Sequence, residues 1–102
     1  MSNEQLKQEL LQYFDDNMFT KNIEIAKQLG EINLVRGMNL TRARLAHRDA
    51  LGIIHYYWSA VYGTDNSIKF SEEMKRCGLV RFEDLLEDFR VKFGNTTLSS
   101  IM

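Results

Sequence analysis

Arginine and aromatic side chains are concentrated in one stretch of this sequence, "TRARLAHRDALGIIHYYWSAVYG" at residues 41–63. Guanidinium groups make forked hydrogen bonds to carboxylate and phosphate oxygens, and tyrosine and arginine are enriched where protein interfaces bind most tightly. On one helix Arg44 and Arg48 lie one turn apart, on the same face as His55 and Tyr62. The pattern predicts a surface for a protein partner, with four contact residues: Arg44, Arg48, Tyr56 and Tyr62.

The same cations support two other interpretations. In the first, they hold the phosphates of a nucleic acid, and the contact residues are Arg36, Arg42, Arg44 and Arg48. A helix-turn-helix motif at residues 23–39 fails in register, because the buried position of its second helix falls on Arg36. The formal net charge of -1 also gives no general attraction to polyanions. In the second interpretation, the arginines form a solvated face, partly neutralised by acidic side chains at residues 83–88.

The sequence offers little material for catalysis. Its two histidines, His47 and His55, are eight residues apart. That spacing differs from the three or four residues that aim two imidazoles at one metal from a single helix. The single cysteine, Cys77, lies on an apolar stripe with Phe70 and Met74, which favours a buried and unreactive thiol. We therefore expect no enzyme activity, no metal site and no cofactor.

Composition predicts a small folded domain without a membrane partner. The chain has 102 residues, of which 44% are hydrophobic and 26% charged, a balance typical of globular proteins. No apolar run approaches the roughly 18 to 20 residues of a membrane-spanning helix, and the N-terminus lacks the pattern of a signal peptide. Because a lone cysteine fits a reducing compartment, we expect a cytoplasmic protein.

Hydrophobic periodicity predicts an all-α fold, a small bundle of four to five helices. The expected helices cover residues 3–16, about 20–37, about 40–62, a short stretch ended by Gly78, and 81–94. The turn formers at residues 15–17 separate the first two, and Gly37 ends the second, while Gly30 leaves open an earlier end or a kink. Residues 1–94 would form a single helical domain, and residues 95–102 a flexible C-terminal tail after Gly94.

The long central helix at about residues 40–62 is the expected spine of the bundle. Its apolar arc consists of Ala43, Ala46, Ala50, Ile53, Ile54, Tyr57, Trp58 and Val61. The apolar faces of five short helices are generous for this chain length, so we also expect a homodimer or larger homo-oligomer that buries the surplus. The sequence thus predicts a helical protein-binding module, acting as a regulator, inhibitor or accessory subunit, with nucleic-acid binding as the alternative.

Overall fold

Five helical segments build the molecule in the computed structural model, which describes the backbone of residues 3–101 and the side chains of residues 3–93. No strand occurs within these bounds, which confirms the predicted all-α bundle. The first segment joins α1 (Asn3–Phe14), the π-helical stretch η1 (Asp15–Phe19) and α2 (Thr20–Gln28) in one run. The others are α3 (Ile32–Ala46), α4 (Ala50–Tyr62), α5 (Asp65–Arg76), and a short 3₁₀ turn η2 (Glu83–Leu85) that continues into α6 (Leu86–Ile101).

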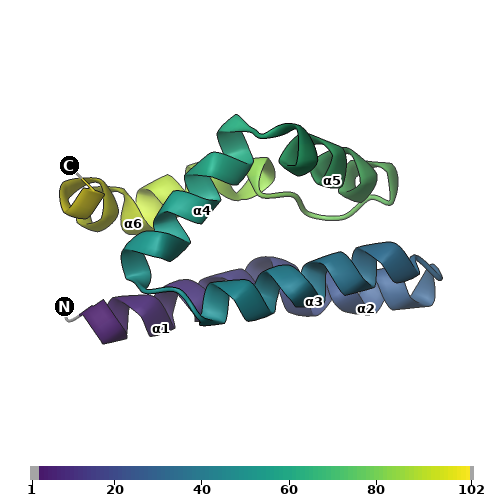
Figure 1. Ribbon diagram of the computed structural model, residues 1–102, viewed down its shortest axis with the longest axis horizontal. Helices are drawn as coiled ribbons and strands as arrows, with labels where there is room; N and C mark the ends of the chain where they lie inside the picture. Colours follow the sequence, from purple (N-terminus) through teal and green to yellow (C-terminus); the bar gives the residue numbers. More distant parts are fainter. Residues whose placement is uncertain (1–2, 102) are drawn as a thin grey trace.

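The helices form two layers. Figure 1 shows the α1–α2 run and α3 side by side in one layer, with α4, α5 and α6 in the other. Because α4 follows α3 after a sharp change of direction, it carries the chain from the first layer to the second.

The turn predicted at residues 15–17 is wrong, because the chain stays helical there. Both flanking residues, Phe14 and Thr20, have right-handed helical backbone angles, and η1 absorbs one extra residue per turn. Phe14, Met18 and Phe19 are all buried. Burial of this apolar face outweighs the local turn preference of the Asp-Asp-Asn sequence.

The second helix ends just before Gly30, the earlier of the two glycines considered. Gly30 has a φ of 73°, and its amide and that of Glu31 donate to the carbonyls of Lys27 and Ala26, as in a glycine-based helix cap. Gly37, the predicted stop, lies inside α3 instead. A Cβ at Gly37 would lie 2.9 Å from Cε2 of Phe70, so this glycine lets the ring of α5 approach the backbone of α3.

The predicted continuous helix at about 40–62 is also wrong. It is interrupted at residues 47–49, where Asp49 has extended backbone angles and its side chain accepts a hydrogen bond from the Gly52 amide at 2.8 Å. Asp49 is therefore the N-cap of a new helix. Of the predicted apolar arc, Ala43 and Ala46 are exposed, whereas the α4 members Ala50, Ile53, Ile54 and Tyr57 are buried as expected.

The predicted helix end at Gly94 is not observed, since the backbone of α6 continues to Ile101. Side chains from residue 94 onward lie outside the described part of the chain. The flexible tail expected at residues 95–102, beyond a domain at 1–94, stays a prediction.

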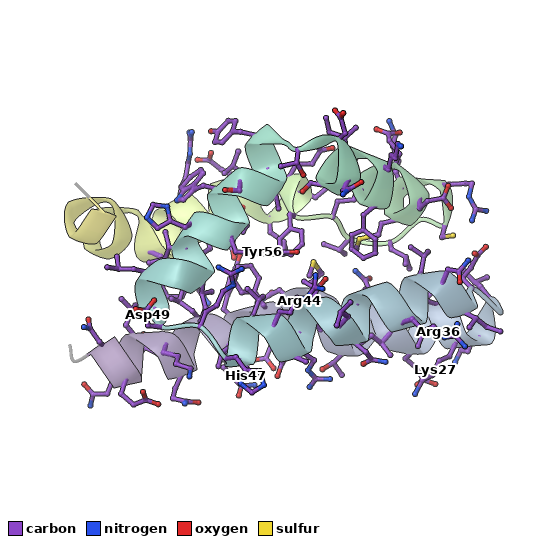
Figure 2. All side chains as sticks on the ribbon, in the orientation of Figure 1. Lys27, Arg36, Arg44, His47, Asp49 and Tyr56 are labelled. Carbon is purple, nitrogen blue, oxygen red and sulfur yellow. The ribbon has the colours of Figure 1, made fainter. Side chains whose placement is uncertain are left out.

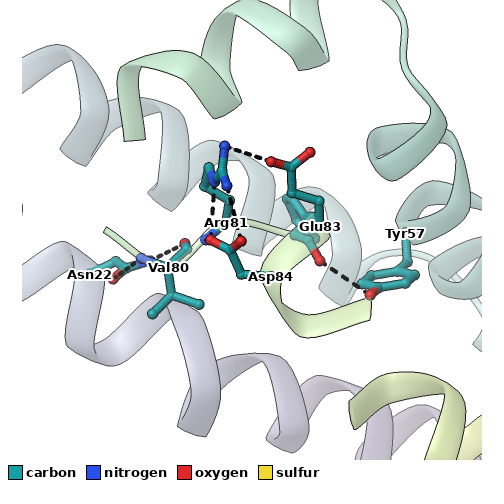
Figure 3. A network of polar contacts seen from close by, with 7 residues as sticks. Asn22, Tyr57, Val80, Arg81, Glu83 and Asp84 are labelled. Atoms are coloured by element: carbon teal, nitrogen blue, oxygen red, sulfur yellow. Dashed lines mark hydrogen bonds and ion pairs between the residues drawn. The ribbon is translucent and has the colours of Figure 1, made fainter. Parts of the chain in front are cut away.

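Three fully buried rings join α1, α4 and α6. Phe14, Tyr57 and Phe89 are each 0% exposed, and the Tyr57 and Phe89 rings stack with centroids 4.0 Å apart. The ring of Phe14 lies 5.5 Å from Tyr57 and 5.9 Å from Phe89. Tyr57 donates its hydroxyl hydrogen to the carbonyl of Phe82 (Figure 3), and burial raises the pKa of this phenol above its usual value. This aromatic cluster holds the two layers together.

A buried amide ties the layers together at a second place. Asn22 of α2, only 1% exposed, donates to the carbonyl of Val80 at 2.7 Å and accepts from its amide at 3.3 Å (Figure 3). Val80 lies in the loop between α5 and η2, so one side chain satisfies both backbone groups of a residue in the other layer.

The substitution Asn22→Ala is expected to lower the free energy of unfolding by about 1–2 kcal/mol, because it leaves the backbone groups of Val80 without their partner. Urea denaturation followed by circular dichroism measures this change. The matched control Asn39→Ala gains the same helix propensity at an exposed position of α3, and should remain within about 0.7 kcal/mol of the parent. Equal stability of the two variants would contradict a structural role for the Asn22 amide.

Candidate functional site

A groove of about 340 Å³ lies between α3 and the layer formed by α4 and α5. Figure 2 shows Arg44 and Tyr56 in the space between these two layers. The groove is lined by twelve described residues: Gly37, Leu40, Thr41, Arg44, Tyr56, Ala60, Asn66, Ser67, Phe70, Ser71, Met74 and Phe82. Its size falls at the lower end of the range of about 300–1,000 Å³ for ligand sites, so the groove is a candidate binding site.

One face of each of two helices forms the walls. Helix α3 contributes residues 37, 40, 41 and 44, the spacing of neighbours on a helix surface, and α5 contributes residues 66, 67, 70, 71 and 74. The close approach of Phe70 to Gly37 joins the two walls, and the buried Met74 and Phe82 make the interior apolar.

Among the side chains that the structure describes, Arg44 is the only charged one in the lining. Among the described residues, its exposed guanidinium has no ion pair and no hydrogen-bond partner. A cation next to an apolar groove, and without a partner of its own, is available to a carboxylate or phosphate from another molecule.

Arg48 reaches the same region from the loop between α3 and α4. Its Cζ atom lies 5.7 Å from the ring centroid of Tyr56, a cation–π contact worth about 0.5–1 kcal/mol at an exposed site. The other neighbour of this ring is Phe82, in an edge-to-face contact at 5.8 Å. Three predicted partner-binding residues, Arg44, Arg48 and Tyr56, therefore gather around the groove, although the helix that was expected to align them is broken.

Tyr62, the fourth predicted contact, lies elsewhere, at the end of α4. Its ring, 66% exposed, stacks on Trp58 with centroids 5.7 Å apart. Its hydroxyl oxygen accepts a hydrogen bond from Arg90 at 3.2 Å, and the guanidinium of Arg90 lies over the Trp58 ring. Tyr62 thus belongs to a separate surface cluster with α6.

The four arginines of the nucleic-acid interpretation do not form one free cationic surface. Arg42 makes an ion pair with Asp15, whose Oδ1 lies 2.9 Å from Nε. Arg36 lines a different hollow, beside the α2–α3 turn, and lies about 12 Å along the helix axis from Arg44. Two of the acidic residues expected to neutralise the arginines are engaged differently, because Glu83 and Asp84 pair with Arg81 (Figure 3), whose guanidinium lowers the pKa of Asp84.

The residues considered for catalysis lie apart from the groove. His47 and His55 are exposed, and Cys77 is half-buried, where burial raises the pKa of its thiol. The side chains of residues 3–93 include no group of three histidine, cysteine or acidic residues that could hold a metal ion. No helix in the described part of the chain is long and apolar enough to cross a membrane.

Comparison of the chain with models of protein families, with curated proteins and with solved structures found no match.

Apart from Arg44 and Tyr56, sequence reasoning missed the residues that line the groove, among them the apolar Phe70, Met74 and Phe82. Their spacing on apolar stripes predicts burial, and that is correct for Met74 and Phe82. The available signal was Gly37, because a glycine within a helical pattern marks a close approach of another element. The sequence does not say that this element is α5.

The N-cap at Asp49 sets the corner that brings Arg48 to Tyr56. The substitution Asp49→Ala is expected to lower the free energy of unfolding by about 1 kcal/mol, because the Gly52 amide loses its acceptor. Asp49→Asn keeps an acceptor oxygen and should stay within a few tenths of a kcal/mol of the parent, on the order of the difference between good caps. Chemical denaturation of both variants measures the effect, and an Asp49→Ala chain as stable as Asp49→Asn would argue against the cap.

Proposed function

We propose that this chain is a non-enzymatic, cytoplasmic protein-binding module that acts as a regulator, inhibitor or accessory subunit. Its contact surface is the groove between α3 and α5 together with Arg44, Arg48 and Tyr56. The observation that carries the proposal is an open apolar groove whose single charged lining residue is an arginine with no ion-pair partner among the described residues. Protein interfaces combine an apolar centre with tyrosine and arginine anchors in this way.

Nucleic-acid binding is the alternative, and the geometry supports it less. Phosphate contacts require several free cations along one surface, whereas Arg42 is paired with Asp15 and Arg36 lies beside another hollow. An apolar groove also has no role in holding phosphates. Arg44 and Arg48 are then better explained as the charged rim of a protein interface.

Self-association is a second candidate, favoured by a different surface. Ile25, Leu29 and Ile32 lie around the α2–α3 turn and are 42%, 56% and 63% exposed. Large apolar side chains gathered on a surface are typical of contact sites. A dimer through this turn would leave the groove open to another partner.

A bulky side chain in the groove should abolish partner binding. In Thr41→Trp, the indole fills space between α3 and α5, and the partner captured from the native host by the parent chain should be lost. Asn39→Trp places the same residue on the exposed side of α3 and should retain that partner. Mass spectrometry of the captured proteins, repeated after nuclease treatment, provides the measurement.

Circular dichroism and urea denaturation establish that the variants fold. If Thr41→Trp does not fold, Arg44→Glu tests the same surface, because the side chain that it replaces is exposed. Loss of the partner with Asn39→Trp as well, or its retention in Arg44→Glu and Thr41→Trp, would contradict the assignment of the surface. Loss on nuclease treatment would support nucleic-acid binding instead.

A further inference from the structure

The groove changes in chemical character along its length. On the α3 wall, Gly37 and Arg44 are separated by about 10 Å, or two helical turns. At Gly37 the ring of Phe70 lies against the α3 backbone and closes the groove, so its open apolar space lies between this contact and Arg44. At Arg44 the walls carry a positive charge. A ligand that matches both parts has a bulky apolar group and, within two helical turns of it, an anion.

The charges around the groove favour an anionic over a cationic group in the ligand. Within residues 3–93, no aspartate or glutamate lines the groove. The Arg48 guanidinium over the ring of Tyr56, a lining residue, adds a second positive charge beside the groove. A carboxylate placed here would gain two attractive interactions, whereas an ammonium group would be repelled by both arginines.

The volume limits what enters the groove. A space of about 340 Å³ accepts one or two large side chains, but not the body of a helix, whose diameter with side chains is about 10–12 Å. Partner helices commonly bind in this manner, lying across a groove and inserting apolar side chains spaced three, four or seven residues apart. The two-turn length of the α3 wall matches such a spacing.

We propose that the groove binds an acidic amphipathic helix of a partner protein. The partner inserts one or two large apolar side chains between α3 and α5, and a carboxylate on the same helix lies against Arg44 and Arg48. This inference rests on the proposed function, and it adds the chemistry of the partner segment.

Two model peptides of about 15 residues, long enough to form a helix on binding, test this chemistry. They share one row of leucines spaced at helical intervals and differ only in flanking residues, which are glutamates in one and lysines in the other. Binding to the full chain is measured by fluorescence polarisation, and the contact site by changes in the backbone amide resonances of Gly37, Thr41 and Ser71. We expect the glutamate peptide to bind at this site, and the lysine peptide to bind at least about ten-fold more weakly.

Two matched arginine variants locate the charge preference. Arg44→Gln should weaken binding of the glutamate peptide about three- to five-fold, as expected for a partly exposed ion pair, and should narrow the difference between the peptides. Arg36→Gln removes the same charge from another hollow of α3 and should change neither affinity. Equal binding of the two peptides, equal effects of the two variants, or no shift at the groove would overturn the proposal.

A third probe separates a protein segment from a free amphiphile with the same chemistry. If decanoate shifts the groove resonances while neither peptide does, the site takes small amphipathic carboxylates and the proposal is wrong. These outcomes are independent of the proposed function, because partner capture that depends on Thr41 would still stand if the acidic peptide showed no preference for the groove.

Discussion

The packing of Phe14, Tyr57 and Phe89 is the interaction on which the rest of the structure depends. Each ring comes from a different helix, so α4 must direct Tyr57 toward α1 and α6. Leu45 of α3 is also fully buried. On one uninterrupted helix the directions of Leu45 and Tyr57 would differ by about 120°, so the two side chains would face different parts of the core. The break at residues 47–49 lets α3 and α4 orient these two side chains independently.

The groove is a consequence of the same break. Once α4 leaves the direction of α3, the two layers are joined by the aromatic cluster, by Asn22 with Val80, and by the approach of Phe70 to Gly37. Between these points α3 faces α4 and α5 across an open, mostly apolar space. The corner also directs Arg48 back over Tyr56, so that charge and apolar surface meet at one end of the groove.

Periodicity predicted the helical class and the buried residues of α4, because apolar side chains at intervals of three and four determine which face of a helix is buried. It placed the helix ends less well. Asp49 has the side chain of a good N-cap, but the arginine stripe suggested continuity across it. The residues at 15–17 prefer turns in isolation, and burial of Met18 and Phe19 overrides that preference. The chemistry of the side chains selected Arg44, Arg48 and Tyr56, which lie around the groove, and Tyr62, which does not. Which of these residues lie together depends on the corner at residues 47–49, and sequence spacing alone does not predict that corner.

Both the fold and the site require that α3 and α4 are separate helices and that α3 faces α5 across the groove. Nuclear Overhauser spectroscopy of the full chain can detect both features. The structure predicts cross-peaks between the Hα protons of Gly37 and the ring protons of Phe70, with an interruption of the sequential helical pattern at residues 47–49. An unbroken helical pattern from residue 40 to residue 62, with no cross-peak between Gly37 and Phe70, would contradict both the fold and the site.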